Sequence, residues 1–211
     1  IHIDSSVGGL FEGVAFESAE RGFTLDGNAN NTGEIVNTLK NVSFKNIYTP
    51  IFASIVNNDQ SIRVFNIEDN VTSENYTAFT TDERVKFVLT ATDATLQAQE
   101  GLNVTVSETL ATQHYEVIYE GGFYKVAKEQ KVKIIPGGST YPTLAEAISN
   151  ATSGYELLFL ADINESVTVN KNLTIDGDGK NYTGTMSISS GKIVTVENIN
   201  FVKGCIDKQK G

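Results

Sequence analysis

The chain is poor in the residues that staple or anchor small proteins. One cysteine, Cys205, occurs among 211 residues, which excludes an internal disulfide framework and any zinc or iron–sulfur site built from several cysteines. Tryptophan is absent and proline occurs 3 times. No segment approaches the ~18 consecutive apolar residues of a membrane-spanning helix. We therefore expect no membrane span. A chain of this length can bury a stable core without disulfide bonds or structural metal ions.

Basic residues are also scarce. The chain has 16 Lys and Arg residues against 26 Asp and Glu residues, for a formal net charge of -10. A polyanion is repelled by such a balance, so nucleic acid is excluded as a general partner. Asn, Ser, Thr and Gly are abundant instead, a composition typical of β-rich globular proteins.

Apolar residues recur mainly with a period of two, which indicates strands. Short runs of this kind are bounded by Gly, Asn, Asp or Ser, and helical periodicity is almost missing. The pattern predicts an all-β chain with strands near residues 14–16, 39–44, 62–67, 85–89, 104–106, 115–119, 123–126, 132–135, 157–160, 167–169, 173–175 and 193–201.

One short helix is predicted from Thr143. Thr143 and Glu146 form a capping box, because Ser or Thr followed three residues later by Glu satisfies the first free amides of a helix. Apolar residues then follow at helical spacing up to Ala151, and Gly154 is the expected stop. This amphipathic helix must cover an apolar surface.

Two stretches of the chain repeat each other. Residues 23–28 (FTLDGN) match residues 173–178 (LTIDGD), and residues 35–44 (IVNTLKNVSF) match residues 193–201 (IVTVENINF). The spacing between the two motifs differs in the two copies. Similar strands joined by loops of different length are typical of solenoids, in which neighbouring rungs bury one another's inner side chains.

These motifs resemble the rungs of right-handed parallel β-helices of the pectin-lyase-like kind, found in extracellular proteins of microbes. The resemblance implies a right-handed parallel β-helix with one short capping helix, the segment from Thr143. Residues 76–135 do not fit the rungs and predict an antiparallel β segment. We therefore expect three parts: rungs at 1–75, the antiparallel segment at 76–135, and the helix-capped start of a second β-helix unit at 136–211.

The order of these parts suggests permutation, because the start of a solenoid lies near the C-terminus and inner rungs lie near the N-terminus. Two explanations stay open. The chain is a processed or excised piece of a protein with neighbouring tandem units, or it is a subunit that associates end to end with copies of itself. Both predict an exposed β edge at each end.

Candidate catalytic residues are few. His2 and His114 are separated in sequence from any nucleophile or paired carboxylate, and Cys205 sits between apolar positions that suit a small buried side chain. The expectation is that the protein is not an enzyme and has no catalytic residues.

Oxygen-bearing side chains offer one metal candidate, a calcium loop at Asp26, Asn28, Asn30 and Glu34. Asn31 stands where such a loop requires glycine, and Asn37 where it requires a bidentate Glu. Asn and Asp also fill turns without any ion, because they tolerate left-handed backbone. Calcium is thus the candidate cofactor, with no cofactor as the alternative.

The glycosylation motif Asn-x-Ser/Thr is unusually frequent. It occurs nine times, against roughly three expected from the Asn, Ser and Thr content. Either the protein is exported to a glycosylating surface, or Asn turns before Thr-rich strands produce the tripeptide. The candidate acceptors are Asn30, Asn41, Asn70, Asn75, Asn103, Asn150, Asn164, Asn172 and Asn181.

These observations predict a structural or adhesive building block, extracellular or on a cell surface, that assembles through exposed β edges. The alternative is a glycan-binding or glycan-cleaving β-helix domain, including the fibres and spikes of phages, with surface glycans as its partner. A groove lined by carboxylates and aromatic walls would favour this alternative.

Overall fold

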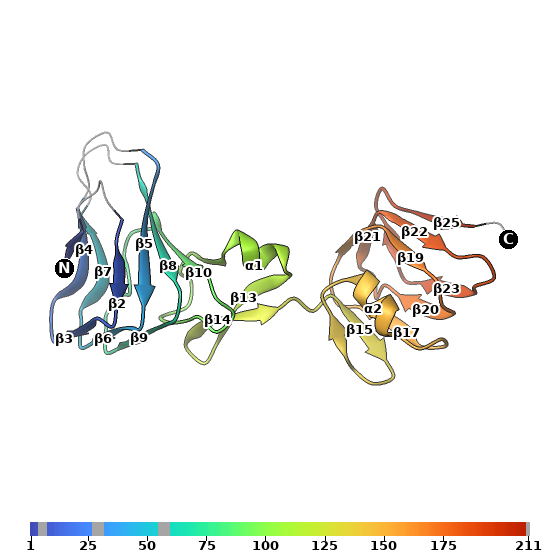
Figure 1. The fold of residues 1–211 in the computed structure, drawn as a ribbon, viewed down its shortest axis with the longest axis horizontal. Helices are drawn as coiled ribbons and strands as arrows, with labels where there is room; N and C mark the ends of the chain where they lie inside the picture. Colours follow the sequence, from blue (N-terminus) through green and yellow to red (C-terminus); the bar gives the residue numbers. More distant parts are fainter. Residues whose placement is uncertain (4–7, 27–31, 55–59, 210–211) are drawn as a thin grey trace. The chain divides into compact units, whose positions relative to one another are not determined.

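The computed structural model describes residues 1–3, 8–26, 32–54 and 60–209. These residues are mostly β-strand with two short helices, and the chain divides into two compact units, Ile1–Ala127 (unit 1) and Lys128–Gly211 (unit 2) (Figure 1). This division lies upstream of the expected boundary after residue 135. The reason is that β15 (Val132–Ile135) pairs with β17 (Glu156–Phe159) of unit 2 and therefore begins that unit.

The described residues of unit 1 form three sheets, which the chain visits in the same order three times from β1 to β9; from β10 onward it adds strands to the second and third sheets only. Their strand orders are β1-β4-β7, β12-β10-β8-β5-β2 and β13-β14-β11-β9-β6-β3. We call one passage through the three sheets a circuit. The strands are β1 (His2–Ile3), β2 (Leu10–Glu12), β3 (Ala15–Glu17), β4 (Arg21–Asp26), β5 (Glu34–Lys40), β6 (Val42–Lys45), β7 (Thr49–Ser54), β8 (Ile62–Ile67), β9 (Asn70–Glu74), β10 (Val85–Leu89), β11 (Thr95–Gln97), β12 (Val104–Val106), β13 (Tyr115–Glu120) and β14 (Phe123–Lys128), the last of which ends at the boundary.

Strands of successive circuits pair in parallel, β1 with β4, β4 with β7, and likewise in the other two sheets. From β2 to β8 the circuits of unit 1 are about 28 residues long, as in the bond from Asn41 to Asp69, whose separation is 28, and they shorten toward β10 and β12. Parallel pairing requires a crossover between partners, and here the crossover is the rest of the circuit.

The expected antiparallel segment at 76–135 is wrong for its first half. β10 pairs in parallel with β8 and β12, and β11 pairs in parallel with β9. Antiparallel pairing begins with β14 against the other side of β11. Alternation of apolar residues identifies a strand but carries no information on its neighbour's direction, and the loops that lead into β10 and β11 were too irregular to be recognised as parts of circuits.

A helix that the sequence pattern did not predict, α1 (Glu108–Thr112), follows Ser107. The Ser107 side chain accepts a hydrogen bond from the Leu110 amide, which is an N-cap. Five residues are too few for helical periodicity to show, so the Ser107 cap was the only usable signal.

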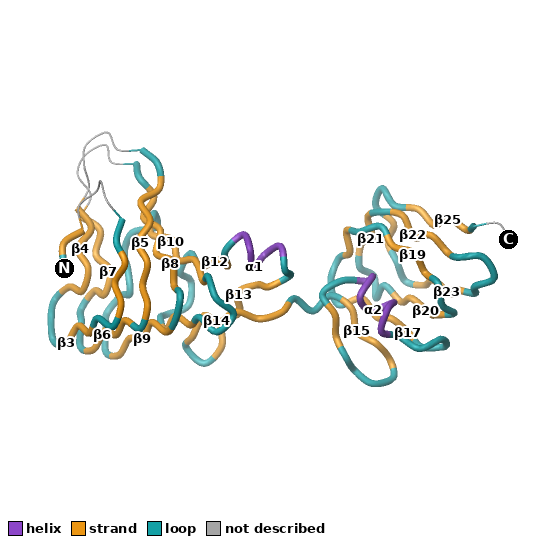
Figure 2. The backbone as a smooth tube through the Cα atoms, viewed as in Figure 1, coloured by secondary structure: helices purple, strands orange, loops and turns teal. Residues whose placement is uncertain are grey.

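Unit 2 repeats the plan with shorter circuits. Its sheets have the strand orders β16-β15-β17-β20-β23, β18-β21-β24 and β19-β22-β25, and pairing is parallel from β17 onward. Hydrogen bonds between circuits join residues 19 apart. The strands not yet given are β16 (Thr140–Tyr141), β18 (Ile163–Asn164), β19 (Val167–Val169), β20 (Leu173–Asp176), β21 (Asn181–Thr183), β22 (Thr185–Ile188), β23 (Val194–Glu197), β24 (Asn200–Phe201) and β25 (Cys205–Lys208) (Figure 2).

The helix predicted from Thr143 is α2 (Leu144–Asn150). Thr143 Oγ1 accepts a hydrogen bond from the Glu146 amide at 3.1 Å, which confirms the cap, and the helix ends at Asn150, before Gly154. Its apolar face is buried in the core of unit 2 through Leu144, Ala147 and Ile148.

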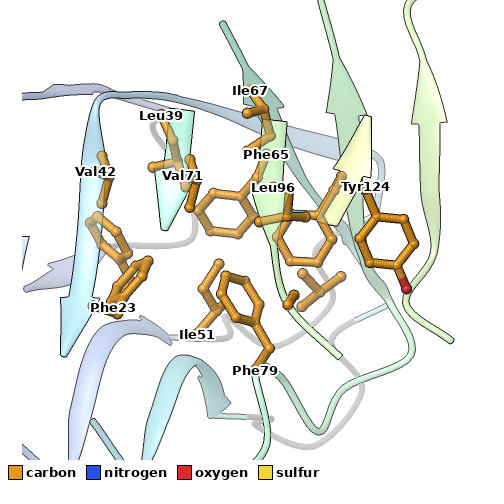
Figure 3. Packing of buried hydrophobic residues seen from close by; sticks show 14 of the residues in the cluster. Phe23, Leu39, Val42, Ile51, Phe65, Ile67, Val71, Phe79, Leu96 and Tyr124 are labelled. Atoms are coloured by element: carbon orange, nitrogen blue, oxygen red, sulfur yellow. The ribbon is translucent and has the colours of Figure 1, made fainter. Parts of the chain in front are cut away.

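Each unit has its own core of inward-pointing side chains. In unit 1 the core is rich in phenylalanine, with Phe23, Phe65 and Phe79 among its fully buried residues (Figure 3). Alternate residues of a strand point inward, and paired strands lie ~4.8 Å apart, so inward residues of successive circuits form columns. Phe16 and Phe44 occupy one such column, with ring centroids 5.1 Å apart.

Candidate functional site

The residues considered for catalysis lie on three separate segments of the chain. His2 is exposed on β1 and His114 is half-buried after α1, both in unit 1, whereas Cys205 lies on β25 of unit 2. The expectation that Cys205 is a buried filler is wrong, because its side chain is exposed. Cys205 stands on an edge strand, where no further circuit covers it.

The calcium candidates are only partly described. Asn28 and Asn30 lie outside the described residues, Asp26 ends β4, and Glu34 is exposed at the start of β5. Among the residues that the structure does describe, no three His, Cys, Asp or Glu side chains are grouped to hold a metal ion. The part of the loop that is described thus gives no support for a calcium site.

Asn30 also lies outside the described residues, and the other eight glycosylation candidates lie on or beside strands and turns. Asn181 is half-buried, and seven are exposed: Asn41, Asn70, Asn75, Asn103, Asn150, Asn164 and Asn172. Five of the eight use the side-chain amide nitrogen, the glycan acceptor atom, as a hydrogen-bond donor: Asn41, Asn70, Asn75, Asn150 and Asn181. Much of the excess of these tripeptides thus coincides with asparagines that have a structural role.

The clearest of these asparagine contacts is a ladder in unit 2. The Asn181 backbone amide and Nδ2 donate to the Asp162 carboxylate at 2.9 and 2.8 Å, and Asn200 Nδ2 donates to Asn181 Oδ1 at 2.6 Å. The three residues occupy equivalent positions in successive circuits, each 19 residues from the next. Hydrogen bonds from Asn181 hold the pKa of the Asp162 carboxyl below its usual value. The ladder binds circuits together.

Two surface hollows lie among the described residues. One, of about 250 Å³, is lined in part by Asp82 and Glu83, and the other, of about 290 Å³, by Asp162 and Asn164. No aromatic residue lines either hollow. Arg84 binds Asp82 through Nε at 3.2 Å and Nη2 at 2.9 Å, so this carboxylate has a structural partner. Neither hollow has the combination of paired free carboxylates and aromatic walls that glycan cleavage needs.

The remaining candidate for a functional site is a pair of strand edges that have no described partner strand on their outer side. In unit 1 the three strands of the first circuit, β1, β2 and β3, are each the last strand of their sheet. In unit 2 the same holds for β23, β24 and β25 of the last circuit. We call these the head edge and the tail edge. Their backbone amides and carbonyls on the outer side have no strand partner among the described residues, which is the condition that favours pairing with another chain.

Both edges also expose apolar side chains. Leu10 on the head edge has an exposed fraction of 61%, and Ile193 and Ile206 at the tail edge have exposed fractions of 74% and 44%. Ile206 is paired with the fully buried Met186 of the preceding circuit, so its side chain points along the core column and is uncovered only on the outer side. Another circuit would bury it as Met186 is buried.

The inner end of unit 2 is closed, in contrast to the tail edge. Glu165 accepts hydrogen bonds from the first amides of α2, at Leu144 (2.6 Å) and Ala145 (3.4 Å). Lys171 Nζ donates to three carbonyls at the other end of the helix, those of Ile148, Ser149 and Ala151, at 2.7 to 2.8 Å. A carboxylate at the N-terminus and an ammonium at the C-terminus both complement the helix dipole. Helix α2 is thereby fixed as a cap.

One sheet of unit 1 finishes in a hairpin at the C-terminal part of the unit. β13 and β14 are joined through Gly121 and Gly122, both with positive φ, and β14 pairs with β11. The Tyr124 hydroxyl donates to the Gln99 carbonyl at 3.0 Å and accepts from the Leu102 amide at 2.8 Å. The hairpin ends this sheet only, since β7 and β12 are the last strands of the other two sheets.

The head edge is acidic. Glu12 and Glu17 end β2 and β3, Glu20 follows, and residues 8–20 contain no Lys or Arg. Glu12 pairs with Lys40 of the next circuit at 3.0 Å, and its hydrogen bond raises the pKa of Lys40. Glu17, Lys45 and Glu74 are register partners in successive circuits, so charges alternate in sign along this column and the column ends in an acid at the head edge.

Comparison with protein-family models, with curated proteins and with solved structures finds no significant match. Among the described residues, no helix is long and apolar enough to cross a bilayer.

Proposed function

We propose that each unit is a right-handed parallel β-helix and that the chain is a structural building block extended through its strand edges. The fold proposal is supported by the mainly parallel sheets, which the chain visits in the same order from β1 to β9 in unit 1 and from β17 to β25 in unit 2, with inward columns and an asparagine ladder between circuits. Right-handed crossovers are the rule for parallel strands. The likeness to pectin-lyase-like β-helices stays at the level of fold and carries no catalytic role.

The observation that carries the function is the contrast between open and closed ends. Helix α2 caps the start of unit 2 and the β13–β14 hairpin ends one sheet of unit 1, while the head and tail edges expose backbone groups and apolar side chains in all three sheets of their units. Natural β proteins usually cover or blunt such edges. Three strand edges that are open at the same end of a unit are suited to receive another circuit.

An extracellular or cell-surface setting is part of the proposal. It is supported by the nine Asn-x-Ser/Thr motifs and by the exposed positions of Asn103, Asn164 and Asn172, whose side-chain amide nitrogens donate no hydrogen bond to any residue that the structure describes. Intact mass of the native product tests it: added sugar mass at these residues supports export, and an unmodified mass contradicts the glycoprotein part of the proposal.

A fusion of two copies tests the building-block function. Joining Gly211 of one copy directly to Ile1 of the next places a tail edge beside a head edge. We expect amide hydrogen exchange in β25 and β3 at the junction to slow relative to β3 and β25 at the outer ends of the same fusion. Equal exchange at junction and outer ends would contradict the function.

The matched control is the same fusion with Ile206→Pro in the first copy. Proline removes a backbone donor from β25 and cannot be accommodated in a paired central strand. We expect junction protection to vanish in this variant while α2 and β17 keep theirs. Loss of protection throughout unit 2 would show that the substitution unfolds the unit, and Ile206→Lys then replaces it as the control.

A further inference from the structure

We propose that the two surface hollows are sugar sites, and that each one seats the first sugar ring of a glycan linked to the asparagine at its rim. This asparagine is Asn103 for the hollow of unit 1 and Asn164 for the hollow of unit 2. The inference rests on the proposed cell-surface setting and says where the glycans lie on the protein. It is carried by the asparagines that line the hollows, the size of the hollows and the groups around them.

Each hollow is lined by an asparagine whose acceptor atom is available. Among the described Asn-x-Ser/Thr motifs, only Asn103, Asn164 and Asn172 have a side-chain amide nitrogen that donates no hydrogen bond to a described residue. Two of these three line the hollows, one in each unit. Asn181 also lines the hollow of unit 2, but its Nδ2 donates to Asp162 at 2.8 Å and is held in the ladder. The hollows thus coincide with sites at which a sugar can be attached without breaking a hydrogen bond.

Attachment at these sites uses the side-chain amide as the nucleophile. Nδ2 forms a bond to C1 of a sugar carried on a lipid diphosphate, and the bond from C1 to the diphosphate oxygen breaks. The diphosphate leaves with that electron pair, and Nδ2 loses one proton. Because the first ring is bonded directly to Nδ2, it lies within reach of the hollow that the same asparagine lines.

The size of the hollows suits a single sugar ring. Their volumes of about 250 and 290 Å³ lie just below the ~300 to 1,000 Å³ typical of small-molecule sites. Free ligands are usually held by hydrophobic and aromatic walls, and no aromatic residue lines either hollow. A covalent tether compensates for a weak site, because it raises the effective concentration of the ligand to the millimolar range. The hollows therefore suit a ring attached beside them better than one taken from solution.

The hollow of unit 1 has polar and apolar groups that a sugar ring can contact. Thr81 and Glu83 are exposed, and their side chains make no hydrogen bond within the described part of the chain. A hydroxyl donates and accepts, and a carboxylate accepts from the hydroxyls of a sugar. Val85 and Leu102 add apolar surface for the C–H groups of the ring.

The hollow of unit 2 has the same combination. Each Asp162 carboxylate oxygen accepts one hydrogen bond from Asn181 and has a lone pair left for another donor. Thr183 Oγ1 donates to the Val202 carbonyl at 3.0 Å and can still accept. The Val202 side chain has an exposed fraction of 41%, and a ring seated in the hollow would cover this apolar surface.

Asn172 provides a comparison within the same chain. It is exposed and its Nδ2 is available, but it lines neither hollow. Its Oδ1 accepts a hydrogen bond from the Ile193 amide at 2.9 Å, so the side chain itself is fixed. A glycan at Asn172 should therefore extend into solvent, with a mobile first ring.

Nuclear magnetic resonance of the full chain tests the inference. The protein is produced in a host that glycosylates asparagine, and an endoglycosidase trims each glycan to one N-acetylglucosamine. We expect nuclear Overhauser effects from the Asn103-linked ring to the methyl groups of Leu102, and from the Asn164-linked ring to those of Val202. The Asn172-linked ring should have the narrow lines of a mobile group.

Two substitutions in unit 2 form a matched pair. Val202→Ser removes apolar surface from the hollow, and the lines of the Asn164-linked ring should narrow to the width seen at Asn172. Ile193→Ser removes a side chain with an exposed fraction of 74% that lines neither hollow, and it should leave the Asn164-linked ring unchanged. Circular dichroism checks that both variants fold. If Val202→Ser does not fold, the contacts in the unsubstituted chain decide alone.

Contacts from both hollow-side rings, together with a mobile ring at Asn172, support the inference. Contact in one hollow only overturns it for the other hollow. Equal mobility of all three rings overturns it altogether and leaves the glycoprotein part of the proposed function intact, as does a host that modifies Asn172 but neither Asn103 nor Asn164. If none of the three is modified, the inference and the glycoprotein part fail together, and the two-copy fusion still decides the building-block function.

Discussion

The two units fill their cores with different kinds of side chain. Most circuits of unit 1 are about 28 residues long and its core is rich in phenylalanine, whereas the circuits of unit 2 are about 19 residues long and its core is mainly aliphatic. Protein interiors are packed without voids, so each unit needs side chains that fill its own interior. The two units therefore have separate cores of different composition.

The largest expected effect is on stability, and it should differ between a phenylalanine of an inner circuit and one of an outer circuit. Phe44 is fully buried between Phe16 and Phe79, so Phe44→Ala should cost unit 1 about 3 to 5 kcal/mol of unfolding free energy. Phe201 is only half-buried on the tail edge, so Phe201→Ala should cost unit 2 about 1 to 2 kcal/mol. Hydrogen exchange in denaturant reports each unit separately. Equal losses would mean that the tail edge is covered or that the inward face is misassigned.

The next largest effect is expected from Lys171, which holds the capping helix α2 of unit 2. Lys171→Met removes three charge-assisted hydrogen bonds to the end of α2 and should cost unit 2 about 1 to 3 kcal/mol, with unit 1 unchanged. Lys180→Met is the matched control, because its pair with Asp178 at 3.4 Å is at the surface and is expected to contribute less than ~1 kcal/mol. If both substitutions have the same effect, α2 is not held by Lys171.

Two buried tyrosines sharpen the comparison of the cores. The Tyr124 hydroxyl of unit 1 makes two hydrogen bonds, whereas the Tyr182 hydroxyl of unit 2 is buried with no partner among the described residues. Tyr124→Phe should therefore destabilise unit 1 by about 1 kcal/mol, and Tyr182→Phe should stabilise unit 2 by about 1 kcal/mol. Denaturant unfolding measures both, and a destabilised Tyr182→Phe would reveal a hydrogen bond that the structure lacks.

Tyr182 also predicts an alkaline effect. Burial raises the pKa of its phenol to about 12 from 10. A raised pKa in the folded state means that the stabilisation is complete below pH 10 and is lost as the pH rises from 10 to about 12. Stability of unit 2 should fall in this window in the native chain and fall less in Tyr182→Phe, as followed by far-ultraviolet circular dichroism. Identical pH profiles would contradict the assignment.

The smallest expected effect is on the stability of unit 1 at acidic pH. Burial alone would raise the pKa of the Asp82 carboxyl, but hydrogen bonds and charge from Arg84 outweigh it and hold the pKa below its usual value. Stabilisation by a lowered pKa is present above about pH 4 and is lost as the pH falls through the folded-state value. Asp82→Asn should flatten this part of the profile of unit 1. An unchanged acid profile would show that Asp82 does not contribute to it.

Much of the architecture was predictable from local pattern. Thr143 and Glu146 identified the start of α2, and the match between residues 35–44 and 193–201 is confirmed at the backbone level, since Asn41 and Asn198 both have left-handed φ values, +51° and +52°. Pairing direction was not predictable, because β10 and β12 alternate as antiparallel strands do. Glu165 and Lys171 lie 14 or more residues beyond the helix they hold, and such contacts leave no local signal.

The central claim is that the head and tail edges are open to a further circuit. Amide hydrogen exchange of the two-copy fusion tests it most directly. The account predicts that β25 and β3 exchange more slowly at the junction than at the outer ends, while inner strands β6 and β22 exchange at the same rate in both copies. Equal exchange of β3 and β25 at the junction and at the outer ends would contradict it.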